Sequence, residues 1–247
     1  MKLWHHGGGE DNTPRLVLIH GLGANADVWL PLVPHVDRRW IAPDLRGHGR
    51  SPHQAPYGYG GHAADVANLL QQDEEVDIVG HSMGGVVGMA LATGWFGIRV
   101  RKVIAFGVKI RWRADEVPKL QALARAPVRL FDTREQAVER YLKVSGLFGL
   151  VDAGGAMAQS GVREEDGKWR LASDPMINAV AGPPELASFV DAMQSPLRLA
   201  AGSKDPMVNA ADMAPFDAHA HVFEGAGHNA QVEQPRELWQ FIREELS

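Results

Sequence analysis

The chain has 247 residues, with 25 Lys and Arg against 30 Asp and Glu, so its formal net charge is −5. An acidic chain is poorly suited to a nucleic-acid backbone, and we expect no nucleic-acid partner. The sequence contains no cysteine, which excludes disulfides, thiolate metal sites and a cysteine nucleophile. Covalent catalysis by this chain would therefore need another nucleophile.

No segment is apolar over the roughly 20 residues that a membrane-spanning helix needs. The first residues lack the apolar stretch of a signal peptide, and they include Glu10 and Asp11. We therefore expect a cytoplasmic protein without a membrane span. The sequence predicts no particular oligomeric state.

Short apolar runs alternate with helical patterns over the first 108 residues. Residues 15–20, 40–43, 76–80 and 100–106 are predicted strands, and residues 61–72 and 83–93 are predicted helices. Strands that are apolar on both faces and alternate with helices indicate a parallel sheet covered on both sides. We therefore predict an α/β fold with a doubly wound, mostly parallel sheet.

The alternation stops soon after the strand that ends near Phe106. Residues 109–194 are more polar and predicted to be mostly helical, with helices at 116–126, 134–144 and 185–194. Strands at 197–201 and 219–223 and a helix at 236–246 then restore the earlier pattern. We therefore divide the chain into a core of residues 1–108 and 195–247 and an inserted helical cap of residues 109–194. Long insertions of this kind are often lids over sites.

Residues 80–84 read GHSMG, a G-x-S-x-G pattern between a predicted strand and a predicted helix. This context is typical of a nucleophile elbow, a sharp turn that exposes the hydroxyl of its serine, here Ser82. The turn leaves no room for side chains at Gly80 and Gly84. Because the helix begins there, the Met83 N–H is the expected donor to a developing oxyanion.

A serine nucleophile needs a base and an acid that orients it, and in this architecture they follow in the order Ser, Asp or Glu, His. Three histidines follow Ser82: His219, His221 and His228. The first two fall in a predicted strand, whereas His228 lies in the loop after it, at the edge where α/β sheets place their sites. Asp205 has the equivalent position after the preceding strand. We therefore predict His228 as the base and Asp205 as the orienting acid.

The loop after the first strand is the expected source of a second oxyanion donor. Gly21 and Gly23 allow the backbone to approach closely there, and we predict that the Leu22 N–H is the donor. The same loop offers an alternative interpretation, since Gly21, Gly23 and Ala26 with Asp44 approach a dinucleotide fingerprint. Prolines in the following segment and the RGHGRS loop after Asp44 argue against it.

Five segments together resemble the α/β-hydrolase fold superfamily: HGLGANADVW (20–29), DLRGHGRS (44–51), GHSMGG (80–85), GSKDP (202–206) and GHNAQVEQP (227–235). The resemblance covers most of the chain outside the cap. It implies a hydrolase without a cofactor, with Ser82 as nucleophile, His228 as general base and acid, and Asp205 as orienter. Only about fourteen residues precede the first predicted strand, so we expect a shortened first hairpin or a missing strand.

We expect cleavage of a small-molecule carboxylic ester or thioester through an acyl-enzyme at Ser82. The same residues would also serve a carbon–carbon bond hydrolase, a lactonase or a cofactor-free perhydrolase or haloperoxidase. A non-catalytic ligand receptor of the same fold is a further alternative. We expect no metal site, because no cluster of carboxylates accompanies the histidine pairs at 5–6 and 219/221.

The substrate pocket is expected between the sheet edge and the cap. We predict that its walls include a set of aromatic, apolar and basic side chains, namely His81, Phe106, Lys109, Trp112, Leu147 and Phe148. Lys109, Arg111 and Arg113 could attract an anion, but their alternate spacing favours a solvated face. We therefore expect a small or medium, partly apolar substrate.

Overall fold

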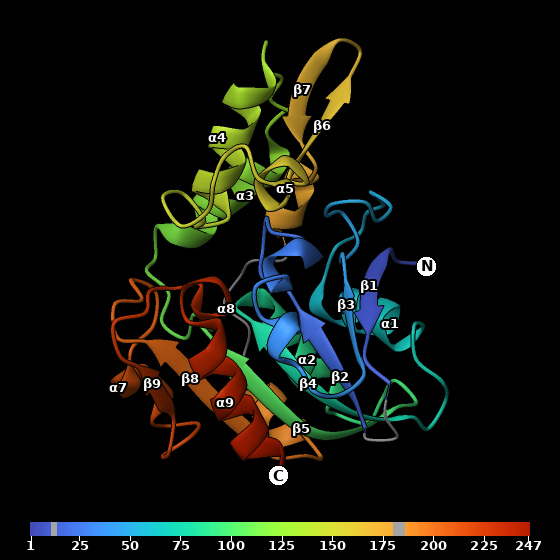
Figure 1. The fold of residues 1–247 in the computed structure, drawn as a ribbon, viewed down its shortest axis with the longest axis vertical. Helices are drawn as coiled ribbons and strands as arrows, with labels where there is room; N and C mark the ends of the chain where they lie inside the picture. Colours follow the sequence, from blue (N-terminus) through green and yellow to red (C-terminus); the bar gives the residue numbers. More distant parts are fainter. Residues whose placement is uncertain (11–13, 180–185) are drawn as a thin grey trace.

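The computed structural model describes residues 1–10, 14–179 and 186–247. Its main sheet contains seven strands within these residues, in the order β1-β3-β2-β4-β5-β8-β9 (Figure 1). The strands are β1 (His5–Gly8), β2 (Arg15–Ile19), β3 (Trp40–Pro43), β4 (Glu75–His81), β5 (Arg99–Phe106), β8 (Leu197–Gly202) and β9 (His221–Phe223). Only the pairing of β1 with β3 is antiparallel. The predicted mostly parallel sheet is confirmed.

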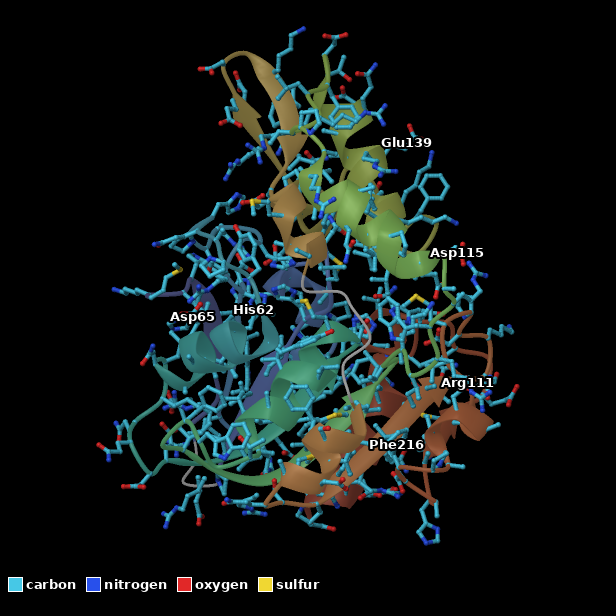
Figure 2. All side chains as sticks on the ribbon, turned by 180° about the vertical axis from the view of Figure 1, so that it is seen from behind. His62, Asp65, Arg111, Asp115, Glu139 and Phe216 are labelled. Carbon is cyan, nitrogen blue, oxygen red and sulfur yellow. The ribbon has the colours of Figure 1, made fainter. Side chains whose placement is uncertain are left out.

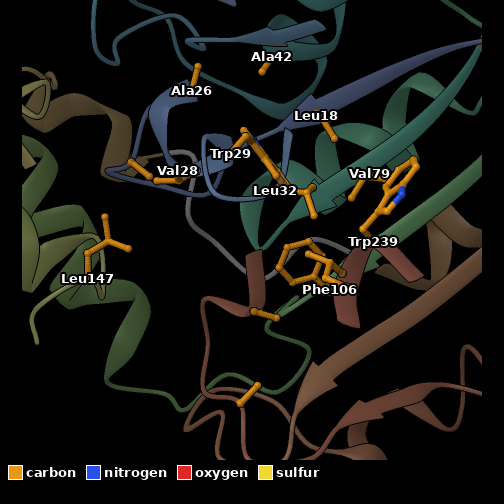
Figure 3. Packing of buried hydrophobic residues seen from close by; sticks show 14 of the residues in the cluster. Leu18, Ala26, Val28, Trp29, Leu32, Ala42, Val79, Phe106, Leu147 and Trp239 are labelled. Carbon is orange, nitrogen blue, oxygen red and sulfur yellow. The ribbon is translucent and has the colours of Figure 1, made fainter. Parts of the chain in front are cut away.

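Side chains of β2 show how both faces of the sheet are buried. Leu16 and Leu18 pack with Trp29 and with α9 (Pro235–Leu246), whereas Val17 and Ile19 pack with α2 (Met83–Leu91) and α1 (Tyr59–Ala67). This alternation follows from the two-residue period of a strand. Figure 3 shows the first of these clusters, in which Trp29 and Trp239 lie close to the sheet.

The helices that close the core begin at recognisable sequence signals. Helix α9 has Pro235 in its first turn, and it buries Leu238, Trp239, Phe241, Ile242 and Leu246 on one face. The short α7 (Ala210–Met213) has a capping box, in which the Asn209 side chain accepts from the Asp212 N–H and the Asp212 carboxylate accepts from the Asn209 N–H. The loop that contains Asp205 therefore runs from β8 to the capped start of α7.

The predicted cap, residues 109–194, follows β5, and its described residues, called the inserted segment below, add no strand to the main sheet. The segment contains α3 (Glu116–Arg125), α4 (Arg134–Val144), α5 (Ala156–Gln159), η3 (Pro175–Ala179) and α6 (Leu186–Ala192). It also contains a hairpin of β6 (Val162–Glu165) and β7 (Lys168–Leu171), where no strand was predicted in a segment expected to be mostly helical. The hairpin turns at Asp166 and Gly167, with φ of 51° and 73°, as expected of an Asp-Gly turn. Most of the segment stands above the sheet in Figure 1.

Several element ends differ from the sequence prediction. Helix α1 begins at Tyr59 and ends at Ala67 rather than covering 61–72. Strand β9 begins at His221, which leaves His219 in the preceding loop. The predicted helix 185–194 corresponds to α6, although Glu185 lies outside the described residues. The part of the chain covered by the structure contains no helix with the length and apolar character of a membrane span.

Candidate active site

Ser82 lies at the sharp turn between β4 and α2, and its backbone is strained. Its φ of 52° and ψ of −118° are outside the regions that L-residues ordinarily occupy. Two hydrogen bonds hold this conformation: the Ser82 N–H donates to the Phe106 carbonyl at 2.8 Å, and the Gly85 N–H donates to the Ser82 carbonyl at 3.0 Å. These bonds fix the serine in its strained conformation at the start of α2.

The glycines of the turn are required by close backbone contacts. A Cβ atom at Gly80 would lie 2.4 Å from the Gly84 carbonyl oxygen, and one at Gly84 would lie 2.2 Å from the Ile19 carbonyl oxygen. The predicted oxyanion loop also lies against this turn, because a Cβ atom at Gly21 would lie 2.9 Å from His81 Nδ1 and 3.2 Å from Ser82 Cβ. The loop after β2 and the turn after β4 therefore meet around the serine.

The two predicted oxyanion donors lie on these two segments. Met83 is the first residue of α2, so its N–H has no acceptor within the helix. Leu22 follows Gly21 and lines the same cavity as Ser82 and Met83. Gly23 does not line the cavity, but its φ of 74° makes the turn that follows Leu22.

His228 and Asp205 form a hydrogen-bonded pair. His228 Nδ1 is 2.8 Å from Asp205 Oδ2, and the Asp205 side chain is 0% exposed. The Met207 N–H donates to Asp205 Oδ1 at 2.8 Å, so both carboxylate oxygens have partners. A carboxylate that accepts from Nδ1–H leaves Nε2 of a neutral imidazole as the basic nitrogen.

Glu233, which the sequence analysis did not single out, holds the loop that contains His228. Its Oε2 accepts from the Gly227 N–H at 2.7 Å, and its Oε1 accepts from the Asn229 N–H at 2.9 Å. The carboxylate of this residue in α8 (Ala230–Glu233) therefore binds the backbone on both sides of His228. Its position within GHNAQVEQP was the only available signal, since a carboxylate in a short helix otherwise resembles a surface residue.

His81 connects the serine turn to the His228 loop. Its Nε2–H donates to the His228 carbonyl at 2.9 Å, and the two ring centroids are 4.6 Å apart. Burial lowers the pKa of His81 well below its ordinary value, and the nearby His228 lowers it further. His81 therefore stays neutral where an exposed histidine would become charged.

A cavity of about 560 Å³ opens beside Ser82 and His228. The core contributes mostly apolar and backbone surface, and the inserted segment contributes a more polar wall. Of the predicted site residues, the cavity lining includes Gly21, Leu22, His81, Ser82, Met83, Lys109, Trp112 and His228. Asp205 lies behind His228, while Gly80 and Gly84 shape the turn.

Three predicted pocket residues lie elsewhere, so these predictions are corrected. Phe106 is buried in the core, where its ring meets Trp29 edge-on with centroids 6.0 Å apart. Leu147 is fully buried in the same apolar cluster (Figure 3), whereas Phe148 is 58% exposed. Neither Leu147 nor Phe148 is among the residues that line the cavity.

The cavity wall also contains residues that the sequence did not single out. These are Ala24, Tyr59, Val86, Val108, Glu116, Lys119, Leu120, Lys143, Val144, Ser145, Gly146, Pro206 and Met207; Arg113, which was expected on a solvated face, also lines the cavity. Pro206 and Met207 could have been found, since they directly follow Asp205. The residues of α3 and α4 could not, because a helical pattern does not state which face turns toward a site.

The alternative dinucleotide interpretation requires a free acidic residue at Asp44. That carboxylate is fully buried and accepts from the Ala26 N–H at 2.7 Å and from the Arg50 N–H and Nε–H at 2.8 Å each. It therefore stabilises the core instead of facing a ligand. The described residues contain no group of three or more His, Cys, Asp or Glu side chains arranged to hold a metal ion.

Comparison with known proteins relates this chain to a family. A family model described as "Alpha/beta hydrolase family" matches residues 16–241. Esterase YbfF of Escherichia coli is 28% identical, and the alignment covers 96% of this chain and 95% of that protein. Lipase LipV of Mycobacterium tuberculosis is 42% identical over 87 residues, and the matched region spans only 33% of its length.

Solved structures show the same fold at low sequence identity. The thioesterase domain from the curacin biosynthetic pathway has a TM-score of 0.78 at 22% identity, covering 97% of this chain and 94% of that one. E-2-(Acetamidomethylene)succinate hydrolase has a TM-score of 0.77 at 23% identity, covering 97% and 92%.

Proposed function

Since the chain belongs to the alpha/beta hydrolase family and is a hydrolase of the esterase type, we propose that it cleaves a carboxylic ester or thioester through an acyl-enzyme at Ser82. One observation carries this proposal: the strained Ser82 shares a cavity with His228, whose Nδ1 is bonded to the buried Asp205. This arrangement is what a hydroxyl nucleophile needs, because a hydroxyl reacts only when a positioned base removes its proton.

In the proposed mechanism, His228 Nε2 takes the Ser82 proton while Oγ attacks the carbonyl carbon of the substrate. The buried Asp205 holds the imidazole and stabilises its positive charge. The N–H groups of Leu22 and Met83 donate to the oxyanion. The proton on His228 then goes to the leaving alkoxide or thiolate. Water, deprotonated by His228, attacks the acyl-enzyme, and the carboxylic acid leaves as Ser82 regains its proton.

The inserted segment acts in this proposal as a lid that completes the substrate cavity. Lys109, Trp112 and Leu120 and residues 143–146 all line the cavity and belong to this segment. Lids of this kind exclude water and select substrates. The core accordingly supplies the chemistry, and the inserted segment supplies much of the contact with the substrate.

Labelling with a fluorophosphonate, followed by identification of the modified peptide, tests the nucleophile. Wild type is expected to be labelled at Ser82, and Ser82→Ala to lose both the label and the turnover of p-nitrophenyl butyrate. Ser145 is a second serine on the cavity wall, and its hydroxyl donates to the Tyr141 carbonyl at 2.8 Å. Ser145→Ala is therefore the matched control and should keep the label. Turnover by Ser82→Ala, or labelling of another residue, would contradict the proposal.

A further inference from the structure

The charge on the cavity wall is opposite to that of the whole chain. The chain carries a net charge of −5, yet among the described residues the cavity lining includes four Lys and Arg side chains and one carboxylate. All five belong to the inserted segment: Lys109, Arg113, Glu116, Lys119 and Lys143. The positive charge is therefore concentrated on one wall, above the apolar floor that the core supplies.

The one carboxylate among the described lining residues, that of Glu116, already has partners within the cavity wall. Glu116 Oε1 is 2.7 Å from Lys109 Nζ, and both side chains are 18% exposed. Glu116 Oε2 also accepts from the Arg113 N–H at 2.8 Å. The Lys109–Glu116 pair is thus neutral as a unit, and the excess positive charge lies on the three remaining cations.

Arg113 has one 3.5 Å contact with Glu116. The other acidic partners of these three cations are exposed residues that do not line the cavity. Lys119 pairs with Asp115 at 2.6 Å, and Lys143 pairs with Glu139. Asp115 and Glu139 are 51% and 55% exposed and lie at the edge of the inserted segment (Figure 2). Exposed pairs of this kind are weak, so an anion in the cavity can compete for the lysines.

Arg111, labelled in Figure 2, is 75% exposed, pairs with the buried Asp212 of α7 and does not line the cavity. Arg113 is similarly exposed, at 74%, but it does line the cavity. Lys109, two residues before Arg111, also lines it. The structure therefore separates Arg111 from its two basic neighbours. Lys119 from α3 and Lys143 from α4 also line the cavity, which was not predicted from the sequence.

We propose that Arg113, Lys119 and Lys143 form a subsite for a negatively charged group of the substrate, beyond an apolar portion next to the scissile bond. The proposal rests on the proposed ester or thioester hydrolysis at Ser82. A carboxylate on the acyl group or a phosphate on the leaving group supplies the same chemistry. The positive wall attracts either, and the attraction weakens with ionic strength.

Two matched substrate pairs distinguish these sources. Butyryl-coenzyme A and butyryl-N-acetylcysteamine share the acyl group and thioester, and only the first carries phosphates. The p-nitrophenyl monoester of adipic acid and p-nitrophenyl butyrate share the leaving group, and only the first carries a carboxylate. At low salt, we expect kcat/KM to be about 5-fold or more higher for the charged member of at least one pair. The preference should fall toward unity in 0.5 M NaCl.

The double variant Lys119→Gln/Lys143→Gln should lose the preference through a raised KM for the charged substrate, with kcat unchanged. A subsite away from the reacting atoms binds the ground state and the transition state equally, whereas damage to the fold would lower kcat on all substrates. Lys168→Gln is the matched control, because Lys168 pairs with the exposed Asp132 but does not line the cavity.

Equal kcat/KM within both pairs, or a preference that survives in the double variant, overturns the subsite. This result is distinct from failure of the proposed function. If the neutral substrates are hydrolysed by wild type but not by Ser82→Ala, the function stands and only the subsite is lost. If Ser82→Ala hydrolyses them, the proposed function itself fails.

Discussion

Replacing Gly84 with alanine should disturb both stability and activity, because the new methyl group would meet backbone atoms that have no room to move. Its Cβ would lie 2.2 Å from the Ile19 carbonyl oxygen and 2.6 Å from the His20 carbonyl oxygen. Such contacts are essentially never closer than 3.0 Å, so β2 and α2 must separate by about 0.8 Å. Overpacking of a core typically costs about 1–3 kcal/mol. We expect about 3 kcal/mol here, since both sides of the contact are backbone.

The same displacement separates the two segments that carry the Leu22 and Met83 N–H groups. A misplacement near 1 Å can cost about 100-fold in rate, and we expect a loss of this order in kcat/KM for p-nitrophenyl butyrate. Urea unfolding followed by tryptophan fluorescence measures the change in stability. Gly60→Ala is the control, because Gly60 lies exposed in α1 and, apart from its chain neighbours and the backbone of its own helix, no described atom lies within 4 Å of its added Cβ. It should raise the free energy of unfolding by about 0.5–1 kcal/mol. A Gly84→Ala protein as stable and active as wild type would refute this reasoning.

Three further substitutions test the site and its surroundings. Asp205→Asn should lower kcat by about 10³–10⁴-fold with a small effect on urea unfolding, because the amide no longer enforces the His228 tautomer; an unchanged kcat would remove Asp205 from the proposed mechanism. Ser82→Gly should be inactive yet about 1 kcal/mol more stable than Ser82→Ala in urea, because glycine relieves the strain at φ 52° and ψ −118°; equal stabilities would argue against strain. Burial lowers the pKa of His62 to about 4. Between pH 6.5 and 4 the unfolded chain therefore binds a proton at His62, whereas the folded chain does not. As the pH falls through that window, His62 should lower the free energy of unfolding by about 3 kcal/mol. His62→Phe should make the loss measured by pH-dependent urea unfolding shallower, and an identical slope would contradict the assignment.

The sequence was informative where apolar pattern and local chemistry agree. RLVLI of β2 is a continuous apolar run and REQAVERYLKV of α4 has a helical period, and their positions were predicted nearly to the residue. Strand β1 was missed because HHGG has no apolar alternation, and only its antiparallel pairing with β3 makes it a strand. The hairpin at 162–171 was missed although Asp166 and Gly167 carried a turn signal, because the surrounding residues were interpreted as part of a helical segment.

In the candidate site too, some residues could be predicted from the sequence and others could not. Ser82, Asp205 and His228 could be located because each lies in a loop at the carboxyl end of a strand, and the topology of a parallel sheet brings such loops together. The cavity wall could not be located, because it depends on how α3 and α4 turn relative to the core. Apolar character alone therefore selected Leu147 and Phe148, whereas Val144 lies on the wall.

The two edges of the main sheet have a consequence for behaviour at high concentration. Within the described residues, one edge is the four-residue β1 and the other is the three-residue β9. Each offers few unpaired backbone groups to a strand from another molecule, and short edge strands are a common protection against edge-to-edge aggregation. The longer strands β2, β4, β5 and β8, which contain continuous apolar runs, lie inside the sheet. Amyloid-like growth from the native state would therefore first require the sheet to lose its outer strands.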